Sequence, residues 1–287
     1  MEERMVNMNS YFRFKERLRG VKRKLEHGLL ALLSPDLLFY IISHERSGTH
    51  FVINTILRNI YIRQGWHNIG EWFGSDDPTN RFAHIDEFNR KWEQTYKQAA
   101  IIKSHCERDL FEARYRRAKV IYVLRNPRDT LTSWFYYLNR VEFYQYNPQV
   151  PDHRCKSFSE FLRRPISSFL KHSYSLHADF SNVAERWASH VSGWLKVAGS
   201  EPDVLVVRYE ELHRDYKPVL KEVASFLGLR LRLRTRPVSL NDASAILPRK
   251  GIIGDWLNVF SEADEAFLRE AVEKAGIKWD RVIDNGG

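Results

Sequence analysis

Polar and cationic residues interrupt the apolar stretch FYIISHERSGTHFVINTI, residues 39–56. The interruption contains four successive residues that could bind an anion: Arg46, Ser47, Gly48 and Thr49. Their backbone N–H groups could form a concavity at the start of a helix, where the helix dipole also favours negative charge. The hydroxyls and the guanidinium would add donors, and the glycine would let a ligand approach the backbone closely. The G-x-x-x-x-G-K-[ST] pattern of the common nucleotide-binding loop is absent, and an ordinary capped turn is the alternative interpretation.

A second segment, KVIYVLRNPRDTLTSWFYYL, ends an apolar run in a cation. Asn126 followed by Pro127 is typical of a helix start. Arg125 precedes that start and Ser133 lies six residues into the helix, so the two could hold a second anion beside the first. A helix start with incidental charges is the alternative.

Two more segments carry groups suited to proton transfer and to charge stabilisation. The segment IIKSHCE places Lys103 and His105 where another apolar run ends. A histidine there can act as a general base, and a neighbouring lysine can stabilise negative charge on a leaving group, although a structural histidine is the alternative. The segment PRKGIIGDWLNVF clusters Arg249, Lys250 and Gly251 in a glycine-broken loop that suits phosphate binding, although surface loops also have this composition.

Buried strands and helices are expected to position these segments. Four apolar runs are typical of parallel strands covered on both faces: 37–42, 99–104, 119–124 and 204–209. Helical patterns follow three of them, at 49–60, 127–139 and 216–228. A further helix is expected after Ser261, its N-cap, with Gly276 as its stop signal. This alternation predicts an α/β fold with right-handed crossovers, in which residues at the ends of strands meet at the carboxyl edge of the sheet.

The chain is expected to form one domain, residues 36–287, preceded by a basic helical segment at residues 1–35. Its length of 287 residues allows one large domain or at most two. Residues 140–183 are richer in Pro, Ser, Tyr and charge, and we expect an irregular insertion or lid there. The basic helix could pack one face on the domain, or it could make weak contact with an acidic membrane surface.

Composition narrows the classes of protein. The net charge of +9 favours an anionic partner. The two cysteines are far apart and the histidines lack metal-ligand spacing, so neither a disulfide framework nor a metal site is expected. The first ten residues are too polar for a secretory signal, and the apolar run at 28–42 is broken and too short to span a bilayer. We therefore expect a cytoplasmic protein without a transmembrane segment.

Together, the four segments resemble the sulfotransferase family, particularly its cytosolic type. That family carries a P-K-S-G-T-T-W-like loop, a K-T-H segment, a strand–R-N-P–helix segment with a serine, and a C-terminal R-K-G-x-x-G-D-W-K-N motif. Here they stand as ERSGTHF, KSH, LRNPRDTLTS and RKGIIGDWLN, in the same order. The resemblance implies a P-loop-kinase-like, three-layer fold with a central parallel sheet flanked by helices. It also implies sulfuryl transfer from 3′-phosphoadenosine 5′-phosphosulfate (PAPS), with adenosine 3′,5′-bisphosphate (PAP) as product and no metal requirement.

The resemblance also implies roles for individual residues. The 5′-phosphosulfate end of the donor would lie on the first segment: Arg46, Ser47, Gly48, Thr49 and His50. The 3′-phosphate would lie on Arg125, Ser133, Arg249, Lys250 and Gly251. Phe51 and Tyr209 would flank the adenine. His105 would remove the acceptor proton, while Lys103 and Arg46 would stabilise the oxygens of the transferring and leaving groups. In such a reaction, positioning and cation placement dominate catalysis.

Several residues depart from the family pattern. Glu45 occupies the usual Pro position, His50 replaces the second Thr of the loop, and Leu257 replaces the Lys of the last motif. The cytosolic dimerisation pattern K-x-x-x-T-V-x-x-x-E is not matched by LNVFSEADEA, so the oligomeric state stays open. A small-molecule acceptor with a hydroxyl or amine would enter between His105 and residues 140–183. An aromatic pocket could be lined by Tyr136, Tyr137, Phe143, Tyr144 and Trp187, although aromatic residues at such spacing are also typical of a core.

Three alternatives belong to different classes. A carbohydrate sulfotransferase would share the donor site but take a glycan. A P-loop-like small-molecule kinase would need a Gly-Lys-[Ser/Thr] loop and a magnesium-holding carboxylate, and neither stands at the expected place. A nucleic-acid-binding module predicts a continuous Lys/Arg stripe, whereas the charge here collects in loops after strands, apart from the N-terminal segment. We therefore expect a small-molecule partner and no nucleic acid.

Overall fold

The computed structural model describes residues 37–62, 66–68, 100–114, 118–146, 154–165, 180–238 and 251–283. The basic segment at 1–35, much of 140–183, and the two cations Arg249 and Lys250 lie outside these ranges.

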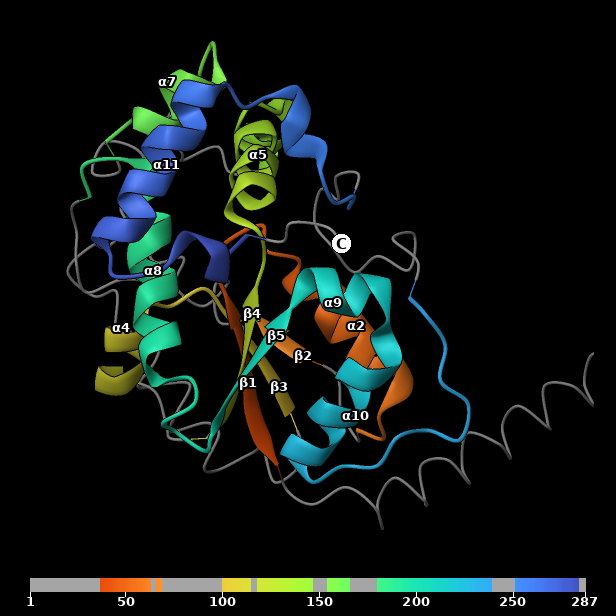
Figure 1. Cartoon of the computed structure of the whole chain (residues 1–287). Coiled ribbons are helices and arrows are strands. Elements are labelled where there is room, and N and C mark those ends of the chain that lie inside the picture. The colour runs from red at the N-terminus through yellow and green to blue at the C-terminus, as the bar shows by residue number, and fades with distance from the viewer. Residues whose placement is uncertain are drawn as a thin grey trace, which may run out of the picture.

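A parallel sheet forms the centre of the described structure (Figure 1). Its strands are β1 (Leu38–Ser43), β2 (Trp66–Asn68), β3 (Ala100–Ser104), β4 (Lys119–Leu124) and β5 (Val204–Arg208), in the order β2-β3-β1-β4-β5. Every neighbouring pair is parallel. The four predicted runs became β1, β3, β4 and β5, which confirms the predicted fold class. The sequence did not predict β2, whose three residues are too few to give an apolar run.

Helices cover both faces of this sheet because the strand residues alternate in direction. Phe39 and Ile41 of β1 pack on one face with α2 (Thr49–Asn59), α9 (Tyr209–Arg214) and α10 (Tyr216–Leu227). Tyr40 and Ile42 pack on the other face with α4 (Arg108–Arg114), α8 (Val183–Val197) and α11 (Glu262–Lys274). Figure 1 shows the two helical layers on opposite sides of the strands. The result is the three-layer arrangement expected of a buried parallel sheet.

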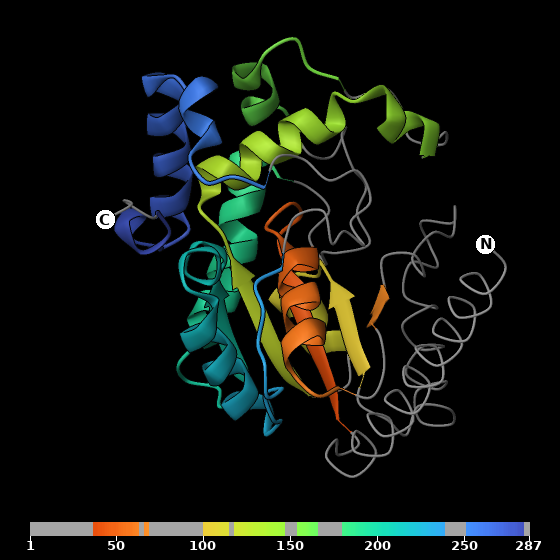
Figure 2. The same ribbon diagram turned by 90° about the vertical axis from the view of Figure 1, so that its right-hand side faces the viewer.

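The remaining helices lie beyond the carboxyl ends of the strands or connect the main elements. Helix α5 (Pro127–Leu138) crosses above the strand ends in Figure 2, and α6 (Val141–Tyr146) and α7 (Phe158–Arg163) follow it. Two short 3₁₀ helices, η2 (Asp255–Asn258) and η3 (Trp279–Arg281), flank α11. Within 140–183, the described residues therefore include two short helices.

Local signals explain where two of these helices start. Helix α5 has Asn126 as N-cap, its side chain accepts a hydrogen bond from the Arg128 N–H, and Pro127 opens the helix. Helix α11 begins with a reciprocal capping box between Ser261 and Asp264, and the chain leaves it at Gly276, where φ is 78°. Both starts agree with the sequence prediction.

The strand order places the ends of β3, β1 and β4 next to one another at the carboxyl edge of the sheet. Strand β3 lies on one side of β1 and β4 on the other, so the chain segments that leave these strands diverge at their carboxyl ends. Ligands of open α/β sheets bind at such switch points. Ser43, Ser104 and Leu124 end the three strands, so the segments singled out from the sequence start at this edge. Among the described helices, none has the length and apolar character of a membrane span.

Candidate active site

The loop between β1 and α2 has an unusual backbone. Arg46 has φ 66°, the one positive value of a non-glycine residue in the described part of the chain, and Gly48 has φ 88°. The Ser47 N–H donates to His44 O at 3.3 Å, and the hydroxyls of Ser43 and Thr49 lie 2.6 Å apart. Gly48 is the N-cap of α2 and makes no side-chain cap, so the first turn of this helix faces the loop without an acidic or hydroxyl cap of its own. The loop therefore carries hydroxyl groups and the Arg46 guanidinium directly before the first turn of α2.

Tyr209 closes one side of this loop. It is buried, and its ring lies so near Gly48 that a Cβ added there would stand 2.4 Å from Tyr209 Cδ2. The phenol donates to Gly251 O at 3.0 Å, which joins the first loop to the last predicted motif. Glycine at position 48 is therefore required both by its backbone angle and by this contact.

Arg125 links the same two loops. Its Nη1 donates to Arg46 O at 3.1 Å and its Nη2 to Ile252 O at 3.0 Å, while the guanidinium lies 4.5 Å above the Tyr209 ring. The Nε atom is buried and has no hydrogen-bond partner among the described residues. A buried guanidinium donor of this kind suits an anion, because an unmade hydrogen bond of a charged group is unfavourable.

Arg46 turns its side chain toward helix α5. Its Nε donates to the Ser133 hydroxyl at 3.4 Å, and its guanidinium lies 4.4 Å from the centre of the Tyr137 ring. The structure thus brings together four residues from three separate segments of the sequence: Arg46, Arg125 with Ser133, and Tyr209. Gly251 joins them through its carbonyl, whereas Arg249 and Lys250 lie outside the described residues.

His105 stands at the carboxyl end of β3 and contacts the end of β1. Its Nδ1 lies 2.8 Å from Ser43 O. Because a carbonyl only accepts, Nδ1 carries the proton and Nε2 keeps its lone pair. Burial, and then the charge of Lys103, hold the pKa of His105 well below its usual range, while Glu45 opposes them. The imidazole is therefore neutral at pH 7 and able to accept a proton through Nε2.

His50 lies in the first turn of α2, where the charges of Lys103 and Arg46 both affect its pKa. Burial, with smaller effects of Lys103 and Arg46, lowers the pKa of His50 to about 4. Lys103 itself is 7% exposed, so its ammonium is largely shielded from water. These three residues place two positive charges and one neutral imidazole near the loop, which is the charge arrangement an anionic ligand requires.

The aromatic residues predicted around the donor and the acceptor occupy several different environments. The Phe51 and Tyr209 rings touch each other, with centroids 5.5 Å apart and planes at 61°, and His213 stacks on Phe51 at 5.3 Å. Tyr136 is exposed, while Trp187, a residue of α8, is fully buried in the core. Tyr137, Phe143 and Tyr144 form one contiguous group, with Tyr137–Phe143 centroids 4.9 Å apart and Phe143–Tyr144 centroids 5.0 Å apart. Of these three aromatic residues, Tyr137 contacts the Arg46 guanidinium.

Sequence reasoning missed several polar residues that hold the site. Glu45 Oε1 accepts from Arg186 Nη2 of α8 at 2.7 Å, and Arg186 Nη1 donates to His44 Nε2 at 3.3 Å. Burial is the main cause that lowers the pKa of His44 to about 4, so its approach of 3.6 Å to Glu45 is not an ion pair at pH 7. His190, one turn after Arg186, contacts the His105 carbonyl at 3.2 Å. The spacing of four residues between Arg186 and His190 is visible in the sequence, but it does not indicate which residues they contact.

Buried carboxylates fix the flanking loops. Asp129 accepts from the Gly254 N–H at 2.9 Å, which ties the last motif to the start of α5. Glu210 accepts from the Asn126 N–H at 2.8 Å, which ties the same helix start to α9. Both carboxylates are buried, and each accepts a backbone N–H of a neighbouring loop.

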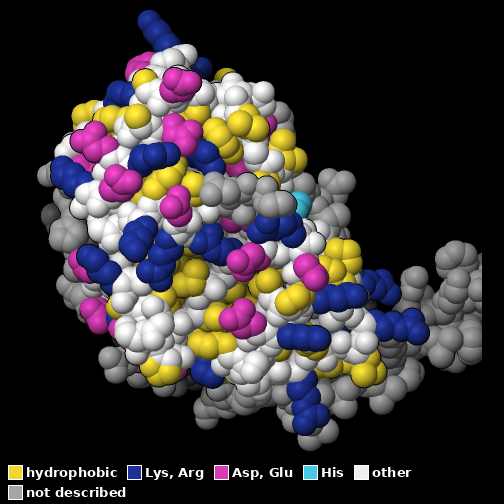
Figure 3. All heavy atoms as spheres, in the orientation of Figure 1, with side chains coloured by type: hydrophobic (Ala, Val, Ile, Leu, Met, Phe, Trp, Pro, Cys, Tyr) yellow, Lys and Arg dark blue, Asp and Glu magenta, His cyan; other side chains and the backbone are white. Residues whose placement is uncertain are grey.

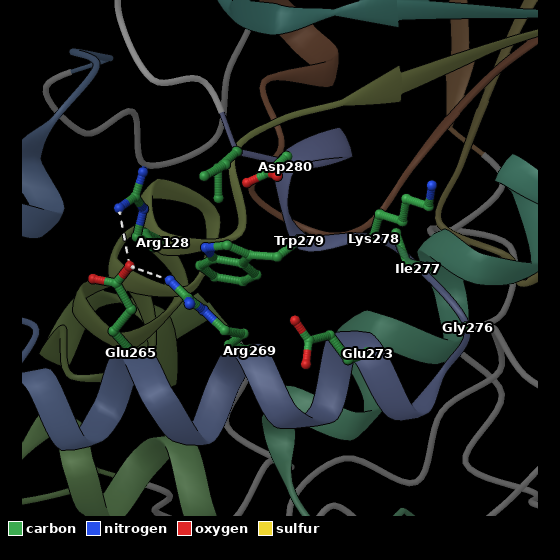
Figure 4. A pocket seen from close by; sticks show the side chains of 10 residues that line it. Arg128, Glu265, Arg269, Glu273, Gly276, Ile277, Lys278, Trp279 and Asp280 are labelled. Atoms are coloured by element: carbon green, nitrogen blue, oxygen red, sulfur yellow. Dashed lines mark hydrogen bonds and ion pairs between the residues drawn. The ribbon is translucent and has the colours of Figure 1, made fainter.

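The structure also has a cavity of about 750 Å³ elsewhere, between Arg128, α11 and η3 (Figure 4). Its lining contains none of the predicted site residues. Glu265 joins Arg128 and Arg269 there, at 3.4 and 3.7 Å, and the lining holds three basic and three acidic residues. Balanced charge of this kind gives no preference for an anion. Among the described residues, no cluster of His, Cys, Asp or Glu has the arrangement of a metal site.

Surface charge on one face is mixed. On the face in Figure 3, Lys and Arg side chains are interspersed with acidic and apolar ones and form no continuous basic stripe over the described residues. This distribution does not resemble a nucleic-acid-binding surface on that face.

The fold is of the P-loop-kinase-like α/β class. A model of the sulfotransferase domain matches residues 36–280. Sulfotransferase 2B1 of Rattus norvegicus is 25% identical over 279 residues, which cover 86% of this chain and 74% of that protein. A 3-beta-hydroxysteroid sulfotransferase of Cavia porcellus is 25% identical over 248 residues, 77% of each chain. The crystal structure of mouse sulfotransferase SULT7A1 complexed with PAP has the same fold, with a TM-score of 0.55, 21% identity, and coverage of 87% of this chain and 88% of that one.

The chain belongs to the sulfotransferase family and is a sulfotransferase, as the resemblance of its four motifs predicted.

Proposed function

We propose that this protein transfers the sulfuryl group of PAPS to a hydroxyl or amine of a small-molecule acceptor, with His105 as general base. One observation carries the proposal: Ser43, at the end of β1, contacts both the anion-binding loop and the expected base, His105. The Ser43 hydroxyl lies 2.6 Å from the Thr49 hydroxyl of the anion-binding loop, and Ser43 O accepts from His105 Nδ1 at 2.8 Å. The loop and the base are thereby held next to each other.

The residues of the two loops fit the donor. Arg46, Ser47, Gly48, Thr49 and His50 would hold its 5′-phosphosulfate end. Arg125, Ser133 and Gly251 would hold the 3′-phosphate, together with Arg249 and Lys250. The buried Arg125 Nε, which has no partner among the described residues, supports an anion at this place. Phe51 and Tyr209 would contact the adenine. When bound, PAPS supplies the sulfuryl group that is transferred, and no metal is required by these residues.

His105 would take the acceptor proton on Nε2. The hydrogen bond from Nδ1 to Ser43 O fixes the tautomer and the direction of the ring. Because the folded pKa of His105 lies below its usual range, the imidazole is neutral and competent throughout the neutral pH range. Lys103 and Arg46 would stabilise the negative charge that grows on the oxygens of the transferring and leaving groups.

The acceptor is best described by its class. The Cavia porcellus relative is named for 3-beta-hydroxysteroids, which supports an alcohol on an apolar small molecule. Tyr137 is the aromatic residue that supports an acceptor contact most strongly, because its ring lies against the Arg46 guanidinium. Contact with the acceptor stays a prediction for the four other aromatic residues: Tyr136, Phe143, Tyr144 and Trp187.

The test is a reaction with PAPS and a panel of alcohols, phenols and amines, with sulfated products detected by mass spectrometry. We expect wild-type product with at least one class. In His105→Ala we expect a rate about 10²–10⁴-fold lower, since a positioned base contributes that much, with PAP affinity retained. A His105→Ala enzyme with the wild-type rate would contradict the base assignment. Absence of product from every PAPS reaction, together with no PAP binding, would contradict the function itself.

A further inference from the structure

A buried ion pair joins the anion-binding loop to helix α8. Glu45 and Arg186 meet at 2.7 Å, with side chains 14% and 1% exposed. The Arg186 guanidinium also donates to His44 Nε2 at 3.3 Å and lies 5.1 Å from the centre of the Trp134 ring. Arg186 thus contacts two successive residues of the loop, immediately before Arg46.

The same helix holds the segment that carries the base. His190 lies one turn after Arg186, and its Nε2 is 3.2 Å from the His105 carbonyl. Since that carbonyl accepts, Nε2 carries the proton, and His190 Nδ1 accepts from the Tyr122 hydroxyl of β4 at 3.0 Å. The His44 and His190 rings meet edge to face at 5.5 Å, so the two contacts of α8 are themselves packed together.

The loop needs an external support because its backbone is strained. Arg46 adopts φ 66°, which a residue with a Cβ adopts reluctantly, and such conformations persist only where the surroundings fix them. On its far side, Arg46 O is held by Arg125. On the other side, the Glu45 carboxylate accepts a hydrogen bond from Arg186. A proline at position 45, as the family pattern has, would restrict the backbone there by its ring, whereas the glutamate is held by contacts of its side chain, among them this ion pair.

We propose that Glu45 and Arg186 are positioning residues for the sulfuryl-transfer site, and that α8 sets the Arg46 loop and the His105 segment relative to each other through Arg186 and His190. This inference rests on the proposed function of the same site. Neither residue is assigned contact with donor or acceptor. Their role is to keep the loop in its left-handed conformation and the base beside it.

The Glu45 carboxylate also lies near several titratable side chains of the candidate active site. Around it stand Arg186 and His190 of α8, His44 of its own loop, His105 after β3 and Tyr122 of β4. Burial, Lys103 and His44 lower the pKa of His105, whereas Glu45 raises it. Removal of the carboxylate charge therefore lowers the pKa of His105 further, a change that loss of packing alone would not produce.

The experiment compares Glu45→Gln, Arg186→Met and the double variant with a matched control, Glu201→Gln. Glu201 lies in the turn before β5 and pairs at 2.7 Å with buried Arg108, the first residue of α4. PAP affinity is measured by calorimetry on folded full-length protein. The pKa of His105 is followed by NMR of ¹⁵N-labelled histidine, and the pH profile of kcat/KM by activity with the best acceptor of the panel.

We expect Arg186→Met to bind PAP about tenfold to a hundredfold more weakly and to lose kcat, since small displacements of a catalytic geometry have effects of this size. The double variant should recover part of the loss, because it leaves no lone buried carboxylate. Glu45→Gln should shift the His105 titration and the acid limb of kcat/KM to lower pH, and Glu201→Gln should change neither. If Arg186→Met does not fold, Arg186→Lys, which keeps the charge but loses the planar fork, replaces it and should show a smaller loss in the same direction.

The inference would be overturned if Glu45→Gln and the folded Arg186 variant both kept the wild-type affinity for PAP, the wild-type kcat and the wild-type pKa of His105. So would equal losses in Glu201→Gln, because they would reflect general destabilisation. Failure of the wild-type protein to bind PAP would instead contradict the proposed function, and the two failures are thereby distinguished.

Discussion

Replacement of Gly48 by alanine perturbs the anion-binding loop at the point where its structure is most constrained. Gly48 has φ 88°, and a Cβ there would stand 2.4 Å from Tyr209 Cδ2 and 2.5 Å from Cε2. Tyr209 cannot move away without loss, since its hydroxyl donates to Gly251 O and its ring packs under Arg125. The new methyl group must therefore displace the loop, the ring, or both.

Two contributions lower the free energy of unfolding of Gly48→Ala. A left-handed backbone conformation costs an alanine about 1–2 kcal/mol. The overlap with Tyr209 adds about 1–3 kcal/mol, the usual effect of an extra methyl group in a tightly packed place. Gly228→Ala is the matched control, because Gly228 also has positive φ, 69°, but no described atom lies within 4 Å of its Cβ position. Gly228→Ala should therefore lose only the free energy that the left-handed backbone conformation costs an alanine.

The assay combines urea unfolding with calorimetric titration of PAP. We expect Gly48→Ala to unfold with a free energy lower by about 2–5 kcal/mol, and Gly228→Ala by about 1–2 kcal/mol. In folded protein, PAP affinity should fall about tenfold or more in Gly48→Ala, since each 1.4 kcal/mol of displacement energy changes a dissociation constant tenfold. Gly228→Ala should bind as wild type. A folded Gly48→Ala protein with wild-type affinity for PAP would refute the assignment of this loop.

Two further predictions concern charge. Arg125→Lys keeps the cation but cannot donate to both Arg46 O and Ile252 O, so we expect PAP binding weaker by about tenfold in calorimetry; unchanged affinity would exclude Arg125 from the donor site. The folded pKa of His44 is about 4 against 6.5 when unfolded, so the unfolded chain binds more protons between these values and stability falls as pH falls through them. His44 alone should remove about 2 kcal/mol of unfolding free energy between pH 7 and pH 5 in urea titrations, and a His44→Gln protein with the same pH dependence as wild type would contradict this cause.

Local patterns were sufficient to predict the main elements from the sequence. The four apolar runs coincide with β1, β3, β4 and β5 to within one or two residues, because strands buried on both faces read as continuous apolar segments. The starts of α5 and α11 were visible in their caps, Asn126–Pro127 and Ser261. Helix α8, by contrast, was not predicted, and its first residue falls at the end of the stretch expected to be irregular.

The site could be predicted in part for a topological reason. Residues that follow parallel strands meet at one edge, so Arg46, His105 and Arg125 were placed together without knowledge of any contact. What could not be predicted are contacts between distant segments. Arg186 is 141 residues from Glu45, and nothing in either local sequence announces the pair. The direct contact of Phe51 with Tyr209 likewise depends on how α2 and α9 pack on the sheet.

The proposed function depends on a PAPS site formed by the β1–α2 loop and Arg125. The most direct measurement is a calorimetric comparison of PAP with ATP plus Mg²⁺ on the wild-type chain and on Arg125→Lys. We expect preferential binding of PAP by the wild-type protein and a weaker PAP signal in the variant. Preferential binding of ATP with Mg²⁺, or no binding of PAP, would contradict it.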